Sequence, residues 1–218
     1  MHQQASLLRR LKMSSFIGHS LAGLTTYAAT QPLQTDQPNE TTFSNQRWLI
    51  WLLVIASLPD IDYLIPTLRL QHAGQTLRTT HSLIGVILVP ACTILVLWLL
   101  GKRGRSLKVQ SLQLILVGLS HLVLDLLVGV FPLPLLYPFS EQVFRLPFGL
   151  LPSAGRIQLT NYFFYRNLLI ELGVLVPLSV SLLLSIRDST RSRTRLFSIA
   201  AGLIISGCFM RWSATLTR

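Results

Sequence analysis

Apolar residues along this chain gather in long runs, and several runs approach the length of about 20 residues that crosses a bilayer as a helix. Four of these runs are residues 82–100, 111–131, 168–186 and 196–212. A fifth run, residues 48–65, is interrupted near its end by Pro59, Asp60 and Asp62. This pattern predicts an all-α, polytopic integral membrane protein with five transmembrane helices.

The first apolar stretch, residues 16–30, is weaker. It follows Arg9, Arg10 and Lys12, and this order of charge and hydrophobicity has the outline of a signal peptide. Polar residues such as His19 weaken its hydrophobic centre, so we expect the stretch to stay in the chain. The sequence predicts an N-terminal segment that either lies in the membrane or spans it.

The chain is predicted to form a single membrane domain over residues 1–218. Residues 31–46 are rich in Gln, Thr and Asn and are expected to form a polar linker, and residues 167–212 a C-terminal helical hairpin. Residues 133–165, with Pro132, hold five of the 11 prolines and many aromatic side chains. Proline interrupts helices and aromatic rings favour the membrane interface, so this segment is expected to be an interfacial loop or lid, or else a structural re-entrant segment.

The net charge of +11 is distributed in a way that favours membrane topology over nucleic-acid binding. No aromatic-basic pattern or known binding module accompanies the charge, so no nucleic-acid partner is expected. Basic residues fill two short loops, which the positive-inside rule places in the cytoplasm. They are Lys102, Arg103, Arg105 and Lys108 in one loop and Arg187, Arg191, Arg193 and Arg195 in the other.

Six ionisable residues lie in or beside the apolar runs, where an unpaired charge costs roughly 2.5–3.5 kcal/mol on insertion scales. They are His19, Asp60, Asp62, His81, His121 and Asp125. With the basic loops in the cytoplasm, Asp60, His81 and Asp125 all fall toward the outer side of the membrane. Such residues are usually protonated, paired or metal-bound, so the sequence predicts a polar site inside the membrane domain.

His121 and Asp125 are four residues apart, and on a helix their side chains can reach one metal ion, although a simple hydrogen-bonded pair has the same spacing. Asp60 and Asp62 follow Pro59. A non-helical turn would point both carboxylates to one side, whereas a continuous helix would separate them by about 200 degrees. The sequence leaves this geometry open, and a polar helix end exposed to solvent would also explain both residues.

The single histidines also have simpler explanations. His81 can be part of a polar helix start capped by Thr79 or Thr80. His19 can be an interfacial histidine.

Imidazoles and carboxylates together are the ligands that zinc and similar divalent ions prefer. We therefore predict a divalent metal ion, zinc before others, with Asp62 as the catalytic base. The predicted metal ligands are His19, Asp60, His81, His121 and Asp125. Bound metal would lower the pKa of a water molecule or polarise a phosphoryl oxygen.

Four further residues are candidates outside this set. Glu171 lies in an apolar run and is a polar site candidate, although a hydrogen bond between helices is the commoner role of such a residue. Arg145, Arg156 and Arg166 are candidate substrate-binding residues that could contact a lipid phosphate, or they could anchor the interface.

The order of these motifs resembles the YdjM-type family of LexA-binding, inner-membrane-associated, metal-dependent hydrolases. The motifs are Gly18-His19-Ser20, Leu58-Pro59-Asp60-Ile61-Asp62, Thr80-His81-Ser82 and Ser120-His121-Leu122-Val123-Leu124-Asp125, followed by Tyr137-Pro138-Phe139-Ser140. The resemblance covers residues 14–140 and implies a metal-dependent hydrolase core in a bacterial inner (plasma) membrane. Relatives often carry a His-Arg pair shortly before the Thr-His-Ser motif. This chain has Thr76, Leu77 and Arg78 there, so the histidine of that pair is absent from these positions.

The ligand order also looks like the first half of the series in the all-helical zinc-dependent phospholipase C group, which implies phosphoester hydrolysis. No histidine follows His121, so the comparison implies at most one complete metal site, or a second one completed by carboxylates such as Asp62. We expect a hydrolase that acts on a lipid or small-molecule phosphoester near the outer leaflet. The alternatives are an ion- or proton-coupled transporter, since intramembrane carboxylates also mark ion pathways, and a non-catalytic scaffold or regulator.

Overall fold

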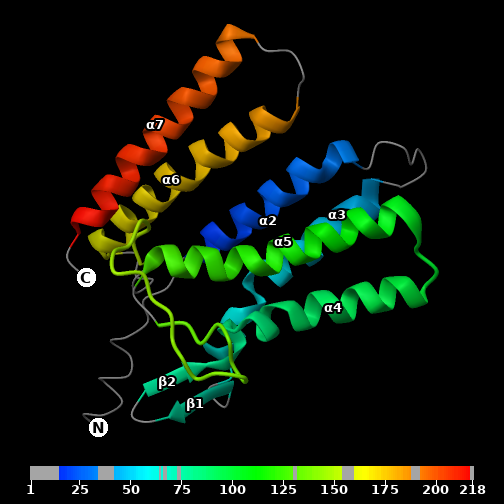
Figure 1. Ribbon diagram of the computed structural model, residues 1–218. Coiled ribbons are helices and arrows are strands. Elements are labelled where there is room, and N and C mark those ends of the chain that lie inside the picture. Colours follow the sequence, from blue (N-terminus) through cyan, green and yellow to red (C-terminus); the bar gives the residue numbers. More distant parts are fainter. Residues whose placement is uncertain are drawn as a thin grey trace.

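The computed structural model describes a bundle of helices whose directions alternate along the sequence (Figure 1). The residues that it describes are 15–33, 42–63, 65, 68–72, 75–129, 132–153, 160–187 and 192–216. The helices are α2 (Phe16–Thr30), α3 (Thr42–Ser57), α4 (Leu83–Leu99), α5 (Gly104–Val128), α6 (Tyr162–Arg187) and α7 (Arg193–Thr215). Because their directions alternate, α2, α4 and α6 begin where α3, α5 and α7 end. We call this the first end of the bundle and the opposite one the second end.

Helix α5 lies at the centre of the bundle and packs against α2, α3 and α4, while α6 and α7 form a hairpin that reaches the rest of the bundle mainly through α2. One apolar core joins α3 to α5 and consists of Leu52, Ile55, Ala56, Leu114 and Val117. A second core joins the end of α5 to α6 and consists of Leu124, Val128, Leu151, Val174 and Leu175. These cores fix the depth of α3 and α6 relative to α5.

The prediction of a helical membrane protein is confirmed, but the predicted number of five transmembrane helices is not. Among the described residues, α5, α6 and α7 are long and apolar enough to cross a membrane. Helix α4 is apolar but has 17 residues. Helix α3 stops at Ser57, because the predicted run 48–65 passes at Pro59 into the 3₁₀ helix η3 (Leu58–Tyr63).

A short β-hairpin adds to the all-α architecture that the sequence predicts. Strand β1 (Arg69–His72) pairs antiparallel with β2 (Gln75–Arg78), with Arg69 opposite Arg78. The hairpin lies between the predicted apolar runs, so hydropathy gave no sign of it. Its second strand leads directly into the 3₁₀ helix η5 (Thr79–His81) and then α4, so the hairpin sets where the Thr-His-Ser motif begins.

The proline-rich connection between α5 and α6 folds back over the first end of the bundle. Leu133 and Leu151 are fully buried, and they anchor the segment through backbone hydrogen bonds to Phe144 and to Leu127 respectively. The loop predicted over residues 133–165 is shorter in the structure, because residues 162–165 form the first turn of α6. Residues 42–46 of the predicted linker likewise belong to α3, and η2 (Gln31–Leu33) continues α2.

Candidate metal centre

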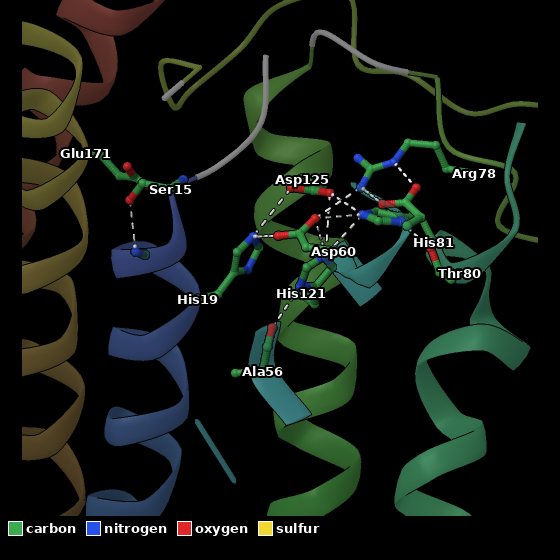
Figure 2. Close-up of polar contacts among 12 residues, drawn as sticks. Ser15, His19, Ala56, Asp60, Arg78, Thr80, His81, His121, Asp125 and Glu171 are labelled. Atoms are coloured by element: carbon green, nitrogen blue, oxygen red, sulfur yellow. Dashed lines mark hydrogen bonds and ion pairs between the residues drawn. The ribbon is translucent and has the colours of Figure 1, made fainter. Parts of the chain in front are cut away.

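The five predicted ligands converge at the first end of the bundle (Figure 2). They come from four separate elements: His19 from the first turn of α2, Asp60 from η3, His81 from η5, and His121 and Asp125 from the last turns of α5. The three histidines are fully buried, and both carboxylates are almost so. Residues that are up to 106 positions apart in the sequence thus share one interior site.

Four of these residues offer ligand atoms that all lie within 4.8 Å of one another: Asp60, His81, His121 and Asp125. Nε2 of His81 is at the centre of this set. It lies 3.3 Å from Oδ1 of Asp60, 3.2 Å from Oδ2 of Asp125 and 3.2 Å from Nε2 of His121. Two ligands of one zinc ion, each about 2.1 Å from it, are separated by about 3.0–3.4 Å, so these distances fit a shared ion.

His19 completes the set from the opposite side. Its Nε2 lies 3.6 Å from Oδ1 of Asp125 and 3.9 Å from Oδ2 of Asp60, and its ring stacks on His121 at 3.9 Å between centroids. Neither ring nitrogen of His19, nor Oδ1 of Asp125, has a hydrogen-bond partner among the described residues. Buried polar atoms rarely stay unsatisfied, so a cation between them fits this side of the site.

Local sequence explains how the two short 3₁₀ helices present their ligands. In η3, Pro59 ends the regular helix, so Asp60 turns toward His81 while Asp62 turns toward the hairpin. Directly after η5, Ser82 caps α4 through its hydroxyl, which accepts the N–H of Gly85 at 3.0 Å. A Cβ at Gly85 would lie 2.6 Å from the carbonyl oxygen of Thr80, so a side chain there would push His81 away from the site.

The outer nitrogens of two ligand histidines are held by neighbouring oxygens. Nδ1 of His121 lies 2.8 Å from the backbone carbonyl of Ala56, which can only accept, so Nδ1 carries the proton. Nδ1 of His81 lies 3.0 Å from Oγ1 of Thr80. In the neutral ring this arrangement directs the Nε2 lone pair of His121 into the site, as in known metal-binding histidines.

Arg78 is a site residue that sequence reasoning missed. Its Nε donates to Oδ2 of Asp62 at 2.7 Å and its Nη2 donates to Oδ1 at 2.8 Å, which is a bidentate pair. Nη2 also donates to Oδ1 of Asp60 at 3.1 Å. The only available signal was its position immediately before the Thr-Thr-His segment. Asp62, predicted as the catalytic base, is therefore fully buried beside the ligand set and bound to Arg78.

Two ligands outside the membrane-crossing helices have shifted pKa values. Burial alone would raise the pKa of the Asp60 carboxyl, but its contact with His81 and the nearby His121 and His19 hold that pKa below its usual value. Burial alone would lower the pKa of His81, but contacts with Asp125 and Asp60 raise it above its usual value. Both shifts reflect the same attraction between the carboxylates and a protonated imidazole ring.

The remaining candidates lie away from the ligand set or outside the described residues. Glu171 is fully buried in α6 and accepts a hydrogen bond from the backbone N–H of Ser15. Arg145 is exposed. Arg166 donates to the side chain of Asn167 and lies over the ring of Phe163. Arg156 falls outside the described residues.

The charges of the site also favour a bound cation. Asp60 and Asp62 contact the guanidinium of Arg78, whereas Asp125 contacts His19, His81 and His121. A buried carboxylate is costly unless positive charge pairs with it, so a metal ion among the histidines would stabilise Asp125.

These features define a class: a helical membrane protein with a buried histidine-aspartate group that could hold a metal ion. A family model described as YdjM inner membrane protein matches residues 13–214, which is nearly the whole chain. The chain therefore belongs to this family, and the resemblance seen in its motifs is confirmed. No curated protein and no solved structure matches it.

Proposed function

We propose that this protein is a membrane-bound, metal-dependent hydrolase that cleaves a phosphoester at the membrane interface. The observation that carries the proposal is the convergence of His81, His121, Asp60 and Asp125 within 4.8 Å, with His19 beside them. We propose zinc as the ion, because three imidazoles and two carboxylates form a mixed nitrogen and oxygen ligand set.

A bound divalent ion would lower the pKa of a water molecule toward neutrality and polarise the phosphoryl oxygen of the substrate. The protein's own groups would hold and orient this ion. His81 and His121 would hold it through Nε2, and Asp60 and Asp125 would add negative charge. The contacts of His121 with Ala56 and of His81 with Thr80 keep both rings in the orientation that this requires.

Asp62 has a more specific role in this proposal than the sequence suggested. Because both of its oxygens accept from Arg78, we propose that it orients Arg78 rather than accepting a proton from water. Arg78 in turn touches Asp60, so it places a positive charge at the edge of the ligand set, where the charge could steady an anionic substrate.

The aromatic residues near the first end support a lipid or lipid-associated substrate. Exposed aromatic side chains lie in the loop over this end and in the first turn of α6, and such side chains are typical of membrane-water interfaces. They are Phe139, Phe148, Tyr162, Phe163 and Tyr165. We propose that α3 and α4 cross the membrane together with α5, α6 and α7. The first end then faces outward, because the two short basic loops, which join α4 to α5 and α6 to α7, lie at the second end.

The structure favours one of the two arrangements considered for residues 16–30. Helix α2 packs against α3, α5 and α6, and it begins at the first end, where His19 meets Asp125. We therefore propose that it spans the membrane with its N-terminal end on the same side as the site. The charge distribution alone favours a segment that lies in the membrane without crossing it, because a spanning α2 puts Arg9, Arg10 and Lys12 on the outer side.

A coupled carrier would share the buried carboxylates but needs a path to both sides. Toward the second end, the apolar core of α3 and α5 follows the ligand set directly, with Leu52 and Leu114 fully buried. This arrangement favours a site that opens to one side only, and it leaves hydrolysis as the better proposal. A scaffold role would predict that substitution of the proposed metal ligands has no effect on phenotype.

The test is hydrolysis of a phosphodiester, a phosphomonoester and phospholipid vesicles by detergent-purified protein. We expect cleavage of one of them that stops on chelation, returns with Zn²⁺ and is lost in the His121→Ala, Asp125→Ala variant. The proposal would be contradicted if the unsubstituted protein kept its activity after chelation and was no more active than this variant. Flux along an ion gradient without hydrolysis would favour the carrier.

A further inference from the structure

A buried carboxylate in α6 contacts the start of the helix that carries His19. Glu171 is fully buried, and its Oε1 accepts the backbone N–H of Ser15 at 3.0 Å (Figure 2). Ser15 is the residue that caps α2, and its hydroxyl accepts the N–H of Gly18, also at 3.0 Å. Glu171 therefore acts on the first turn of α2 from a neighbouring helix.

The contact suits the chemistry of a helix start. The first N–H groups of a helix have no partner within it, and the N-terminal end carries a partial positive charge. A carboxylate placed there satisfies a buried donor and matches that charge. Since Glu171 lies within an apolar helix, this contact gives a physical reason for an otherwise costly residue.

Gly18 makes the close approach of α6 to α2 possible. A Cβ at this position would clash with Oε1 of Glu171 and would lie 3.2 Å from Cδ1 of Leu175. Any side chain at Gly18 must therefore displace Glu171 or move α2 away from α6. The Gly-His sequence thus places a close contact with α6 directly before the ligand His19.

His19 depends on this packing for its position. Its ring nitrogens have no hydrogen bond among the described residues, so stacking on His121 and the path of α2 determine where Nε2 points. We propose that Glu171 is a positioning residue, which fixes the first turn of α2 so that His19 faces Asp125 and Asp60. This inference rests on the metal centre proposed above.

The experiment measures Co²⁺ binding to purified, metal-free protein by affinity and by visible absorption. Glu171→Ala should weaken Co²⁺ binding roughly 10- to 100-fold, the usual effect of losing a residue that orients a ligand, and should change the spectrum as His19→Ala does. Gly18→Ala should have the same effect by displacing Glu171. Glu171→Gln keeps an acceptor oxygen and should bind Co²⁺ within a few-fold of the unsubstituted protein.

The decisive comparison repeats Glu171→Ala in a His19→Ala background. If Glu171 acts through His19, Glu171→Ala should weaken Co²⁺ binding by no more than about twofold once His19 is already alanine. A factor of about two is the scatter of such double-variant comparisons. Ser181→Ala is the matched control, because it removes a hydrogen bond from α6 to Ile199 of α7 and should leave binding unchanged. If Glu171→Ala does not fold, Gly18→Ala takes its place in the same comparison.

An equal loss in both backgrounds would overturn the proposal, and so would unchanged binding and spectrum in Glu171→Ala and Gly18→Ala. Failure of the unsubstituted protein to bind Co²⁺ is a separate result. It would contradict the metal centre itself and remove the basis of this inference.

Discussion

The Nδ1 atom of His121, on α5, lies 2.8 Å from the backbone carbonyl oxygen of Ala56, on α3. The contact ties a ligand to the main chain of a neighbouring helix, so the side-chain identity at position 56 does not provide it. It also fixes which nitrogen bears the proton. The packing of α3 on α5 therefore determines the chemical form in which His121 faces the site.

This contact predicts the tautomer of His121. In zinc-loaded protein labelled with ¹⁵N-histidine, long-range proton-nitrogen correlation spectra should show Nδ1 protonated and Nε2 unprotonated. A His121→Gln variant identifies the signal. Observation of the Nε2-protonated form would contradict both the contact and the proposed ligand atom.

Asp62 and Arg78 are predicted to act as a unit. Asp62→Asn and Arg78→Met should both retain bound zinc, because neither side chain is in the ligand set, yet both should lower phosphodiester turnover by similar factors. The double variant should be no slower than either single one, since the second change removes a partner that is already lost. Turnover that falls with Asp62→Asn but not with Arg78→Met would instead identify Asp62 as the base.

A polar contact at the second end should contribute to the stability of the fold without affecting the metal centre. Gln113 is fully buried; it accepts from Nε1 of Trp48 at 2.6 Å and donates to Oγ1 of Thr30 at 2.7 Å. Gln113→Leu should lower the free energy of unfolding by about 1–3 kcal/mol, for two lost hydrogen bonds, and leave zinc content unchanged. Gln110→Leu is the control, because Oε1 of Gln110 has no hydrogen-bond partner among the described residues, and it should cost less. Equal effects would contradict this account.

Sidedness can be tested by labelling single cysteines in a chain that lacks Cys92 and Cys208. A cysteine at Ser153 should react from outside, and cysteines at Ser106 and Ser192 only after permeabilisation. Ser106 is preferable to Gly104, whose φ of +68° would strain a cysteine. Position 3, outside the described residues, should also react from outside if α2 spans the membrane. The reverse pattern would place the site on the cytoplasmic side.

The sequence was sufficient to predict the helical class and to select the five candidate ligands. Apolar runs show which segments are helical, and His19, Asp60, His81, His121 and Asp125 stand out because ionisable groups are costly there. The spacing of His121 and Asp125 and the alternation of helix directions also indicated that these residues could meet. In the structure all five lie together.

The contacts around the ligands could not be predicted, because each depends on tertiary packing. The Ala56 carbonyl has no sequence signal, and Glu171 meets Ser15 across 156 residues. The pairing of Asp62 with Arg78 follows from a β-hairpin that hydropathy does not reveal. The count of five membrane-crossing helices is not confirmed for a related reason: α3 and α4 are shorter than the predicted runs, and η3 takes the end of the run that begins with α3.

The metal content of protein purified in detergent without chelators tests the central claim most directly. We predict about one zinc or similar divalent ion per chain, and a value near zero in the His121→Ala, Asp125→Ala variant. The Gln113→Leu variant, altered at the second end, should retain the ion. A metal content near zero in all three proteins, each of them folded, would contradict the account.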